Sequence, residues 1–181
     1  MIRISSIVMC LVLYGQAFSQ TMTVVAVKDQ SSASYKLVHP LHEIDATSKD
    51  VEYTAVIDPA KKEIDTVSAT VDVMTFDSGN SNRDSHAMEV VDALTYPDVS
   101  FIGTKFVPAG DSLAVTGKLT FHGVTNDITA WVTPTWNANS LSVSGWFDIS
   151  MTAFKIDRPS LLMIPVKDTL HFTLKAQFGW K

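Results

Sequence analysis

Apolar and polar side chains alternate with a period of two residues along most of this chain, and no other feature constrains its fold as strongly. In the stretch SLAVTGKLTF, the side chains of Leu113, Val115, Leu119 and Phe121 share one face of an extended segment. This period is that of a β-strand, in which successive side chains point to opposite faces. The same alternation recurs in LSVSGWFDI, in TLHFTLKAQFGW, in the row Val67, Ala69, Val71 and Val73, and in the row Val51, Tyr53, Ala55 and Ile57.

Turn signals separate these apolar runs and indicate how the strands are joined. They include Asp58-Pro59, the stretch PAGD, the pair His122-Gly123 and the stretch NANS, which are rich in turn-forming residues. Together with the shorter candidates MTVVAV, YKLV, VSFIGTKF and DITAWV, the runs predict about eight strands in an antiparallel meander. Each strand has one apolar face, so the sheet must pack on another sheet or close on itself. We expect an all-β fold, a single extended antiparallel barrel, because closure satisfies both faces and edges.

One interruption of the strand pattern predicts a short α-helix in a long loop. In SNRDSHAMEVVDALTYP, Pro97 follows a set of apolar residues with helical spacing, namely Ala87, Met88, Val91 and Leu94. Ser81 and Asp84 resemble a capping box at the start of this helix. A second interruption, MTAFKIDRPSLLMIPVKD, has prolines on both sides of the apolar run LLMI. There we expect an irregular cap or a brief helix over one end of the barrel.

The N-terminal residues 1–19 have the pattern of a secretory signal peptide. Arg3 precedes an apolar core from Ile7 to Tyr14, and small residues Ala17 and Ser19 occupy the cleavage positions. We expect cleavage after Ser19, because the apolar core is much shorter than the roughly 20 residues of a membrane-spanning helix. Residues 20–181 would then form one domain. A lipoprotein cleavage site at Cys10, the only cysteine, is the weaker alternative.

Charge and cysteine content exclude some classes of function. The formal net charge is −5 at pH 7, and no block of Lys or Arg occurs. Nucleic-acid binding is therefore disfavoured, since it depends on clustered basic side chains. A secreted chain whose mature part has no cysteine must be stabilised by its apolar core rather than by disulfides.

The polar run SGNSNRDSH, before the expected helix, holds the candidate site residues Asn82, Arg83, Asp84 and His86. A catalytic site would need a nucleophile and a base held by a third group, but no Gly-x-Ser-x-Gly turn or triad pattern accompanies them. We favour a structural polar network in which these four side chains fix the loop. Arg83 is also a candidate for contacting an anionic head group at a barrel mouth, aided by the helix N-terminus.

Two histidines raise the possibility of a metal site. His39 and His42 have H-x-x-H spacing, but Pro40 between them argues against a helix, and the glutamate of the zinc motif is missing. We predict neither a metal nor a cofactor, and the role of these two histidines stays open.

Several motifs together resemble, in order, those of the YceI-like, polyisoprenoid-binding family of secreted bacterial proteins. They are FDSGNSNRDSH, ALTYPDVSF, VTGKLTFHGVTNDITAWV, FDISMTAFKIDRP and VKDTLHFTLKAQF, between about Ser48 and the C-terminus. The resemblance implies a lipocalin-like extended barrel whose interior holds a long isoprenoid chain, and a periplasmic or extracellular location. The N-terminal segment YKLVHPLHEIDATSKDVEY departs from the common pattern of the family. The departure leaves the shape of one barrel mouth open, and with it the size and head group of the ligand.

The inward rows supply the predicted ligand-binding lumen. Glycines 103, 117 and 145 interrupt these rows, and they indicate either sharp bends of the barrel or room for an acyl or prenyl chain. The lumen residues that we predict are Val71, Val73, Val99, Phe101, Leu113, Val115, Leu119, Phe121, Leu141, Val143, Phe147, Leu170, Phe172 and Leu174.

Residues and resemblance together predict a non-enzymatic lipid-binding protein. It would sequester or carry a long isoprenoid, such as a polyprenyl phosphate or a quinone-like molecule, without stable insertion into a membrane. The alternative is a β-barrel with a filled core that acts as an interaction or structural protein of the envelope, and a lipid hydrolase or isomerase is a minor third option. The sequence leaves the oligomeric state open, and a homodimer is possible.

Overall fold

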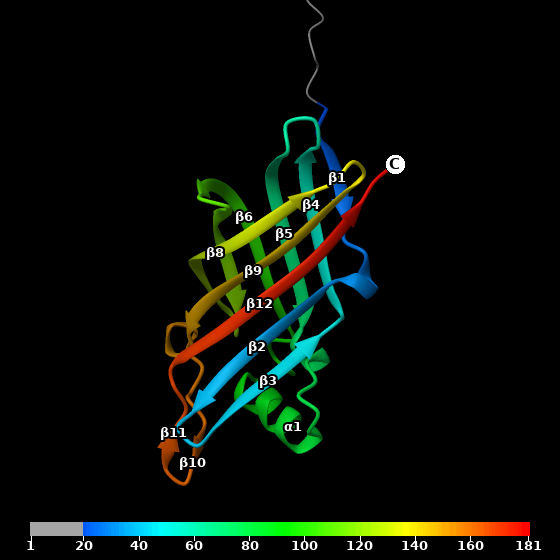
Figure 1. Cartoon of the computed structure of the whole chain (residues 1–181). Coiled ribbons are helices and arrows are strands. Elements are labelled where there is room, and N and C mark those ends of the chain that lie inside the picture. The colour runs from blue at the N-terminus through cyan, green and yellow to red at the C-terminus, as the bar shows by residue number, and fades with distance from the viewer. Residues whose placement is uncertain (1–19) are drawn as a thin grey trace, which may run out of the picture.

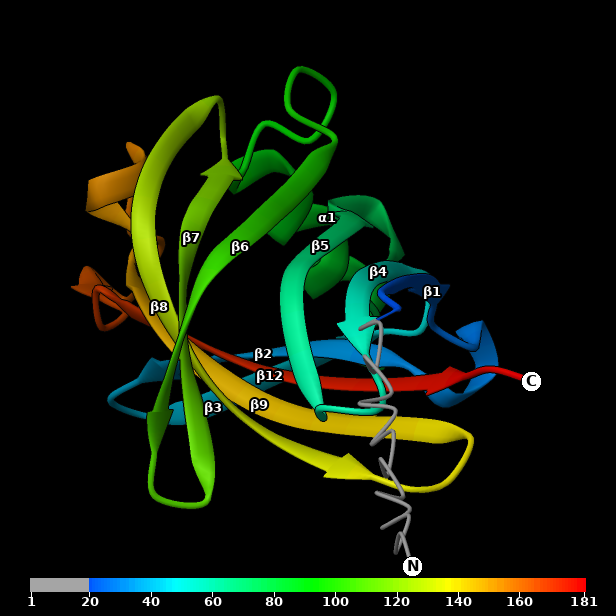
Figure 2. The same ribbon diagram turned by 90° about the horizontal axis from the view of Figure 1, so that it is seen from above.

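The computed structural model describes residues 20–181, so the predicted signal peptide and Cys10 lie outside the described residues. One antiparallel sheet of ten strands dominates the structure, in the order β1-β4-β5-β6-β7-β8-β9-β12-β2-β3. The sheet curls around an interior, with the helix α1 at one end (Figures 1 and 2). Its strands are β1 (Met22–Val25), β2 (Ser32–His39), β3 (His42–Ser48), β4 (Val51–Asp58), β5 (Glu63–Asp72), β6 (Asp98–Ala109), β7 (Ser112–Phe121), β8 (Val124–Trp136), β9 (Ser140–Ser150) and β12 (Thr169–Gly179).

The two halves of the sheet meet at a seam that is only partly hydrogen-bonded. Ala26 forms an antiparallel bridge with Phe178 of β12, and the N–H of Val27 donates to the carbonyl oxygen of Gln177 at 2.7 Å. A second bridge joins Thr47 of β3 to Asp77. The seam therefore closes at its ends by single contacts rather than by a full ladder.

The predicted all-β barrel-like fold is confirmed, but the main sheet has ten strands rather than eight, and a separate hairpin adds two short ones. The alternation did not predict β3, whose sequence HEIDATS is mostly polar. Its inward row is Ile44, Ala46 and Ser48, so only one large apolar side chain marks the buried face. A strand with such a small apolar face resembles a loop in a sequence pattern.

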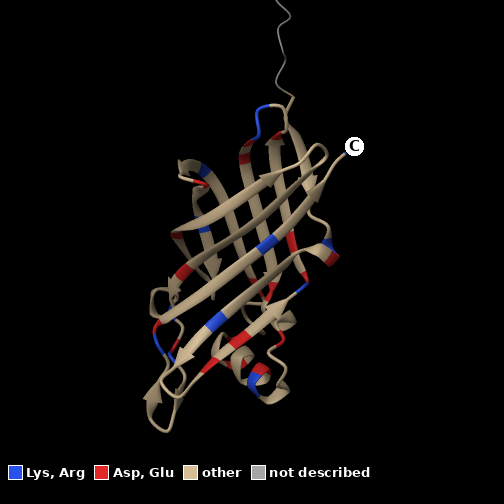
Figure 3. Cartoon of the chain, viewed as in Figure 1, with Lys and Arg blue, Asp and Glu red and all other residues tan. Residues whose placement is uncertain are grey.

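The apolar rows predicted from the alternation face the interior. Leu119, Leu141 and Phe178 are almost fully buried, and all of the predicted lumen residues belong to one continuous apolar cluster. Positions of Lys or Arg and positions of Asp or Glu are interspersed along the ribbon in the view of Figure 3. In the part of the chain that the structure describes, no helix is both long enough and apolar enough to cross a bilayer.

The mid-strand glycines mark close backbone approaches, which decides between the two interpretations left open by the sequence. Gly103 pairs with Gly117 across β6 and β7, next to a shift of register between Gly103 and Lys105. A Cβ atom on Gly117 would lie 2.1 Å from the carbonyl oxygen of Ile102, and one on Gly145 would lie 2.8 Å from that of Trp131. These glycines therefore bend the barrel, and they line neither of the two apolar cavities described below.

The predicted helix is present as α1 (Ser81–Val90), although its cap differs from the prediction. The N-cap is Asn80, whose side-chain oxygen accepts the N–H of Arg83 at 3.2 Å. The predicted capping box of Ser81 and Asp84 is wrong, because Asp84 turns back to the preceding loop and accepts from Ser78. Leu94 lies beyond the helix and is exposed.

The second interruption contains a brief helical turn, as expected, and also a small hairpin that the sequence did not predict. A single 3₁₀ turn, η3 (Thr152–Phe154), follows β9, and a small hairpin of β10 (Ser160–Leu161) and β11 (Ile164–Pro165) comes next. The turn of this hairpin is Leu162 and Met163, so the apolar run LLMI faces solvent.

Candidate functional site

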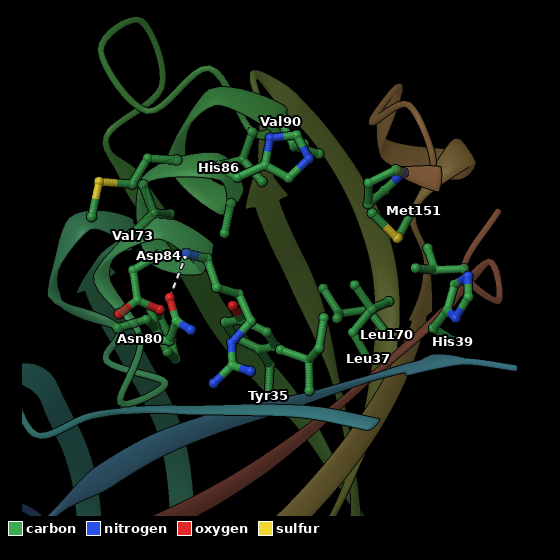
Figure 4. A pocket seen from close by; sticks show the side chains of 18 of the residues that line it. Tyr35, Leu37, His39, Val73, Asn80, Asp84, His86, Val90, Met151 and Leu170 are labelled. Carbon is green, nitrogen blue, oxygen red and sulfur yellow. Dashed lines mark hydrogen bonds between the residues drawn. The ribbon is translucent and has the colours of Figure 1, made fainter. Parts of the chain in front are cut away.

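A pocket of about 480 Å³ lies between α1 and the inner face of β2 and β12. Figure 4 shows His86 and Val90 of α1 on one side of it, with Tyr35, Leu37 and Leu170 of the sheet on the other. Its lining is mostly apolar and comprises Tyr35, Leu37, His39, His42, Ile44, Val73, Phe76, Asn80, Asn82, Arg83, Asp84, His86, Ala87, Met88, Val90, Val91, Val99, Phe121, Met151, Pro159, Ser160, Leu161, Val166, Leu170 and Phe172.

The local sequence of each element explains why these side chains converge. Tyr35, Leu37 and His39 follow at intervals of two, so β2 turns all three toward the pocket. Ala87 and Val90 are three residues apart in sequence, which places them on the same side of α1. The pocket is therefore the space between a strand face and a helix face that do not pack closely.

Polar groups line the pocket where α1 begins. The guanidinium of Arg83 donates from Nε to Ser78 Oγ at 2.8 Å and from Nη2 to the Ser78 carbonyl oxygen at 2.6 Å. The Asp84 carboxylate accepts the N–H of Ser78 at 3.2 Å and also the Ser78 hydroxyl. Arg83 and Asp84 thus hold the same loop residue from neighbouring positions of the helix.

The other two members of the predicted polar network are placed differently. Asn82 and His86 both line the pocket but are exposed. The His86 ring lies 3.7 Å from the Glu89 carboxylate of the same helix. The structure thus brings Arg83 and Asp84 together at Ser78, with Asn80 as the cap, while Asn82 and His86 line the open side of the pocket.

Tyr35 adds a hydroxyl to the pocket. Burial raises the pKa of the Tyr35 hydroxyl, and the Asp84 carboxylate raises it further while the Arg83 guanidinium lowers it. The phenol is therefore neutral at physiological pH. Its ring packs against Phe76 with a centroid distance of 5.3 Å and against Phe172 at 6.4 Å.

His39 and His42 line the pocket where β2 ends and β3 begins. The buried His39 ring bonds through Nε2 to the carbonyl oxygen of Ile164 at 3.0 Å, and its Nδ1 accepts the N–H of Leu41 at 3.1 Å. The His42 ring lies 5.1 Å from the His39 ring. Within residues 20–181, no group of three His, Cys, Asp or Glu side chains could hold a metal ion. The role that the sequence left open for His39 is thus a structural one.

A second, much smaller apolar cavity of about 50 Å³ lies deeper in the barrel. Phe76, Val99 and Phe172 line both cavities. Phe172 also stacks on Phe147, with ring centroids 4.9 Å apart and an interplanar angle of 11°. An aromatic layer of Tyr35, Phe76, Phe147 and Phe172 therefore separates the pocket from the inner cavity.

The predicted lumen residues fall into three groups. Those that line the large pocket are Val73, Val99, Phe121, Leu170 and Phe172. Those that line only the inner cavity are Val71, Phe101, Leu119, Phe147 and Leu174. The remaining four, Leu113, Val115, Leu141 and Val143, line neither of these cavities and pack in the apolar core.

Sequence analysis missed pocket residues outside the clearest strands. Tyr35 and Leu37 belong to the short run YKLV, which predicts a strand, but neither residue is among the predicted lumen residues. The apolar residues of α1 were recognised as helical, and Met151 lies in the turn after β9. The alternation of side chains in β2 could have identified Tyr35 and Leu37 as inward-facing. No sequence pattern indicates that α1 lies over this part of the sheet.

Comparison with known proteins agrees with this fold. A profile described as "YceI-like domain" matches residues 25–178. A UPF0312 protein of Pseudomonas putida is 31% identical over 119 residues, which are 64% of this chain and 62% of that protein. The protein YceI of Salmonella arizonae is 32% identical over 85 residues, or 46% of this chain and 44% of that protein. The chain thus spans less than two thirds of the length of these curated relatives.

Two solved structures are similar over most of the chain. BcnA of Burkholderia cenocepacia has a TM-score of 0.76 at 25% identity, covering 84% of this chain and 98% of BcnA. A polyisoprenoid binding domain from Saccharophagus degradans, implicated in plant cell wall breakdown, has a TM-score of 0.64 and covers 88% of this chain and 98% of that domain. Its identity of 12% shows a shared fold alone. On the profile match over residues 25–178, the chain belongs to the YceI-like domain family.

Proposed function

We propose that this protein binds a long isoprenoid and carries or sequesters it without chemical change. The observation that carries the proposal is the apolar pocket of about 480 Å³ between α1 and β2. Its volume lies within the range of about 300–1,000 Å³ that is usual for small-molecule sites. The similar fold of a polyisoprenoid-binding domain supports an isoprenoid as the chemical class of the ligand.

Burial of hydrocarbon would supply most of the affinity. Each methylene transferred from water into an apolar site contributes about 0.8 kcal/mol. A branched chain of a few prenyl units in this pocket would therefore be bound tightly without many polar contacts. A longer chain would have to displace the aromatic layer around Phe172 and enter the inner cavity, or leave its end outside the pocket.

We assign the head group to the polar end of the pocket. The two hydrogen bonds to Ser78 occupy two N–H groups of the Arg83 guanidinium, and an arginine has five. Arg83 lies in the first turn of α1, where the helix dipole also favours an anion. This arrangement favours a prenyl phosphate over an uncharged prenyl alcohol. Tyr35 would add a neutral hydroxyl as a further donor.

We also propose a cellular location for the protein. The signal-peptide pattern of residues 1–19 and the family together favour a periplasmic or extracellular protein. A ligand with a long hydrocarbon tail has a negligible free concentration in water, so its transfer through an aqueous compartment requires a binding protein. The competing interpretation is an envelope interaction protein that holds no lipid.

Extraction followed by mass spectrometry tests the proposal directly. The protein, purified from its native compartment without detergent, is extracted with organic solvent, and we expect a prenyl compound in near-stoichiometric amount. Replacing Leu37 by Gln places an amide in the pocket wall and should empty it, whereas Val25→Thr alters an exposed residue of β1 and should not. A protein that yields no lipid and fails to bind added prenyl phosphate would refute the function.

A further inference from the structure

The β10–β11 hairpin exposes four consecutive apolar side chains to solvent. The exposed fractions are 46% for Leu161, 77% for Leu162, 97% for Met163 and 41% for Ile164. Single exposed apolar residues are ordinary, but a contiguous group of them at a protruding turn marks a surface that contacts something apolar. Packing inside the fold does not account for these side chains.

The backbone of the turn does not account for them either. Leu162 has φ +52° and Met163 has φ +64°, and these two residues form the entire loop between β10 and β11. A two-residue hairpin loop with positive φ at both positions strongly favours Asn-Gly, because other side chains clash with the backbone in that region. Leucine and methionine therefore occupy positions where they are unfavourable for folding, and their side chains point away from the core.

The hairpin is fixed beside the mouth of the pocket. Ser160 and Leu161 line the pocket, and the His39 ring bonds to the carbonyl oxygen of Ile164 at 3.0 Å. His39 also holds the turn between β2 and β3 through the N–H of Leu41, whose side chain is 62% exposed. Figure 1 shows the hairpin at the same end of the molecule as α1 and the ends of β2 and β3. We call Leu41 and residues 161–164 the apolar tip.

Cations flank the apolar tip. Arg158 and Lys167 are exposed on either side of the hairpin, and the Arg158 guanidinium is held by the carbonyl oxygen of Val166 at 2.8 Å from Nε. Of the carboxylates nearby, Asp157 is exposed, and Glu43 of β3 is paired with Lys36 and also interacts with Lys167. Asp168 accepts hydrogen bonds from Ser150 and Thr152. Basic side chains next to an inserted apolar segment lie at the depth of lipid phosphates.

We propose that the apolar tip inserts into the surface of a lipid bilayer and holds the mouth of the pocket against it. This inference rests on the proposed function in one respect, since a bilayer is the source and the destination of a prenyl lipid. Apolar surface would then continue from the bilayer along Leu161 into the pocket. The ligand tail could move between the two with little exposure to water.

The shape and size of the apolar tip favour a bilayer over a protein partner. A stable protein interface takes about 20–30 residues on each side, whereas the tip has five apolar side chains on two convex turns. A fluid bilayer adapts to such a small convex surface. The net charge of −5 opposes strongly anionic membranes, so we expect insertion of apolar side chains to contribute more than attraction to head groups.

Co-sedimentation with vesicles tests the docking. The test uses the chain from Gln20 onward, which carries every strand that the structure describes, because the apolar stretch of residues 7–14 would itself bind lipid. The double substitution Leu162→Asn with Met163→Gly gives the turn its favoured residues and preserves the fold. The control is Val25→Thr, which changes an exposed apolar residue of β1 that lies outside the pocket lining and the apolar tip. With phosphatidylcholine vesicles, we expect the double variant to partition at least tenfold less than the wild type, and the control to partition equally.

Binding of a short, water-soluble prenyl phosphate without vesicles separates this inference from the proposed function. We expect the wild type and the double variant to bind it equally. Equal vesicle partitioning by the double variant and the wild type would overturn the docking, as would a wild type that does not bind vesicles. A wild-type dimer that the double substitution converts to a monomer would also overturn it and assign the tip to a second copy. Vesicle binding that depends on the tip would support docking even if no prenyl phosphate bound; together with an extraction that yields no lipid, that outcome would refute the proposed function and leave the docking standing.

Discussion

The guanidinium of Arg83 and the backbone of Ser78 are joined by a bond of 2.6 Å from Nη2 to the carbonyl oxygen, and Nε donates to the Ser78 hydroxyl at 2.8 Å. The Asp84 carboxylate accepts the N–H of the same serine. Ser78 thereby fixes both charged side chains at one end of the pocket. Because its orientation is set before any ligand arrives, the guanidinium can bind an anion at a small entropic cost.

Arg83→Met should separate binding of a prenyl phosphate from binding of the matching prenyl alcohol. A hydrogen bond to a charged group contributes about 1.5–3 kcal/mol, so affinity for the phosphate should fall about tenfold or more. Affinity for the alcohol should change little. Fluorescence competition measures both, and Lys175→Met on the outer face of β12 is the control. An equal loss for both ligands would mean that Arg83 acts only on the fold.

Phe172→Leu should lengthen the prenyl chain that the protein accepts. Phe172 lines both cavities and stacks on Phe147 at 4.9 Å, so a smaller side chain connects the pocket to the inner cavity. The variant loses the aromatic pairs with Phe147 and Tyr35, and such a pair contributes about 0.5–1.5 kcal/mol beyond burial. We expect lower stability but a larger gain in affinity for each added prenyl unit than in the wild type. Affinities for a series of prenyl phosphates measure this.

The control for Phe172→Leu is Phe178→Leu, which alters a buried aromatic residue that lines neither cavity. It should lower stability without changing the preference for chain length. If both variants have the chain-length preference of the wild type, the aromatic layer does not limit the ligand.

Alternation predicted the strands in which most side chains of the inward row are large and apolar. The runs that became β7, β9 and β12 are of this kind, and Trp131 and Trp146, out of register with the apolar rows, are exposed and stack with centroids 6.5 Å apart. The alternation did not predict β3, because the inward face of this strand includes the small residues Ala46 and Ser48. Periodicity thus identifies a strand by what it buries, and it fails where little is buried.

The pocket could be predicted only in part, since it depends on how α1 rests on the sheet. Helical spacing identified the apolar face of α1, but its distance from Leu37 depends on the loop held by Ser78 and Arg83. The hairpin at Leu162 was missed for a different reason. Its two turn residues are Leu and Met at positive φ, so the sequence lacks the Asn or Gly that normally indicates such a turn.

Asp168→Asn should weaken the turn after β9 in a manner that depends on pH. Hydrogen bonds from the Ser150 hydroxyl at 2.5 Å and from the Thr152 N–H at 3.0 Å hold the pKa of the Asp168 carboxyl below its usual range. A lowered folded pKa stabilises the fold above the unfolded value, about 3.9 for Asp, and this contribution is lost as the pH falls through the folded pKa. The variant should therefore be less stable than the wild type at pH 7, and the difference should shrink below about pH 4.

Urea unfolding between pH 7 and pH 2 tests the role of Asp168. Asp111→Asn, which changes an exposed carboxyl in the turn between β6 and β7, serves as the control and should follow the wild type throughout. A difference between Asp168→Asn and the wild type that is the same at every pH would show that the charge of Asp168 does not contribute.

Gly117→Ala tests whether close backbone contact at the bend of the barrel is required for the fold. The new Cβ would lie 2.1 Å from the Ile102 carbonyl oxygen and 2.7 Å from the Gly103 Cα, and neither backbone atom can move without breaking the ladder between β6 and β7. Overpacking of this kind costs about 1–3 kcal/mol or more of the free energy of unfolding. Gly179→Ala is the matched control, because a Cβ there meets no atom within 4 Å. Thermal unfolding compares the two variants, and a Gly117→Ala protein as stable as the control would show that the barrel relaxes at this bend.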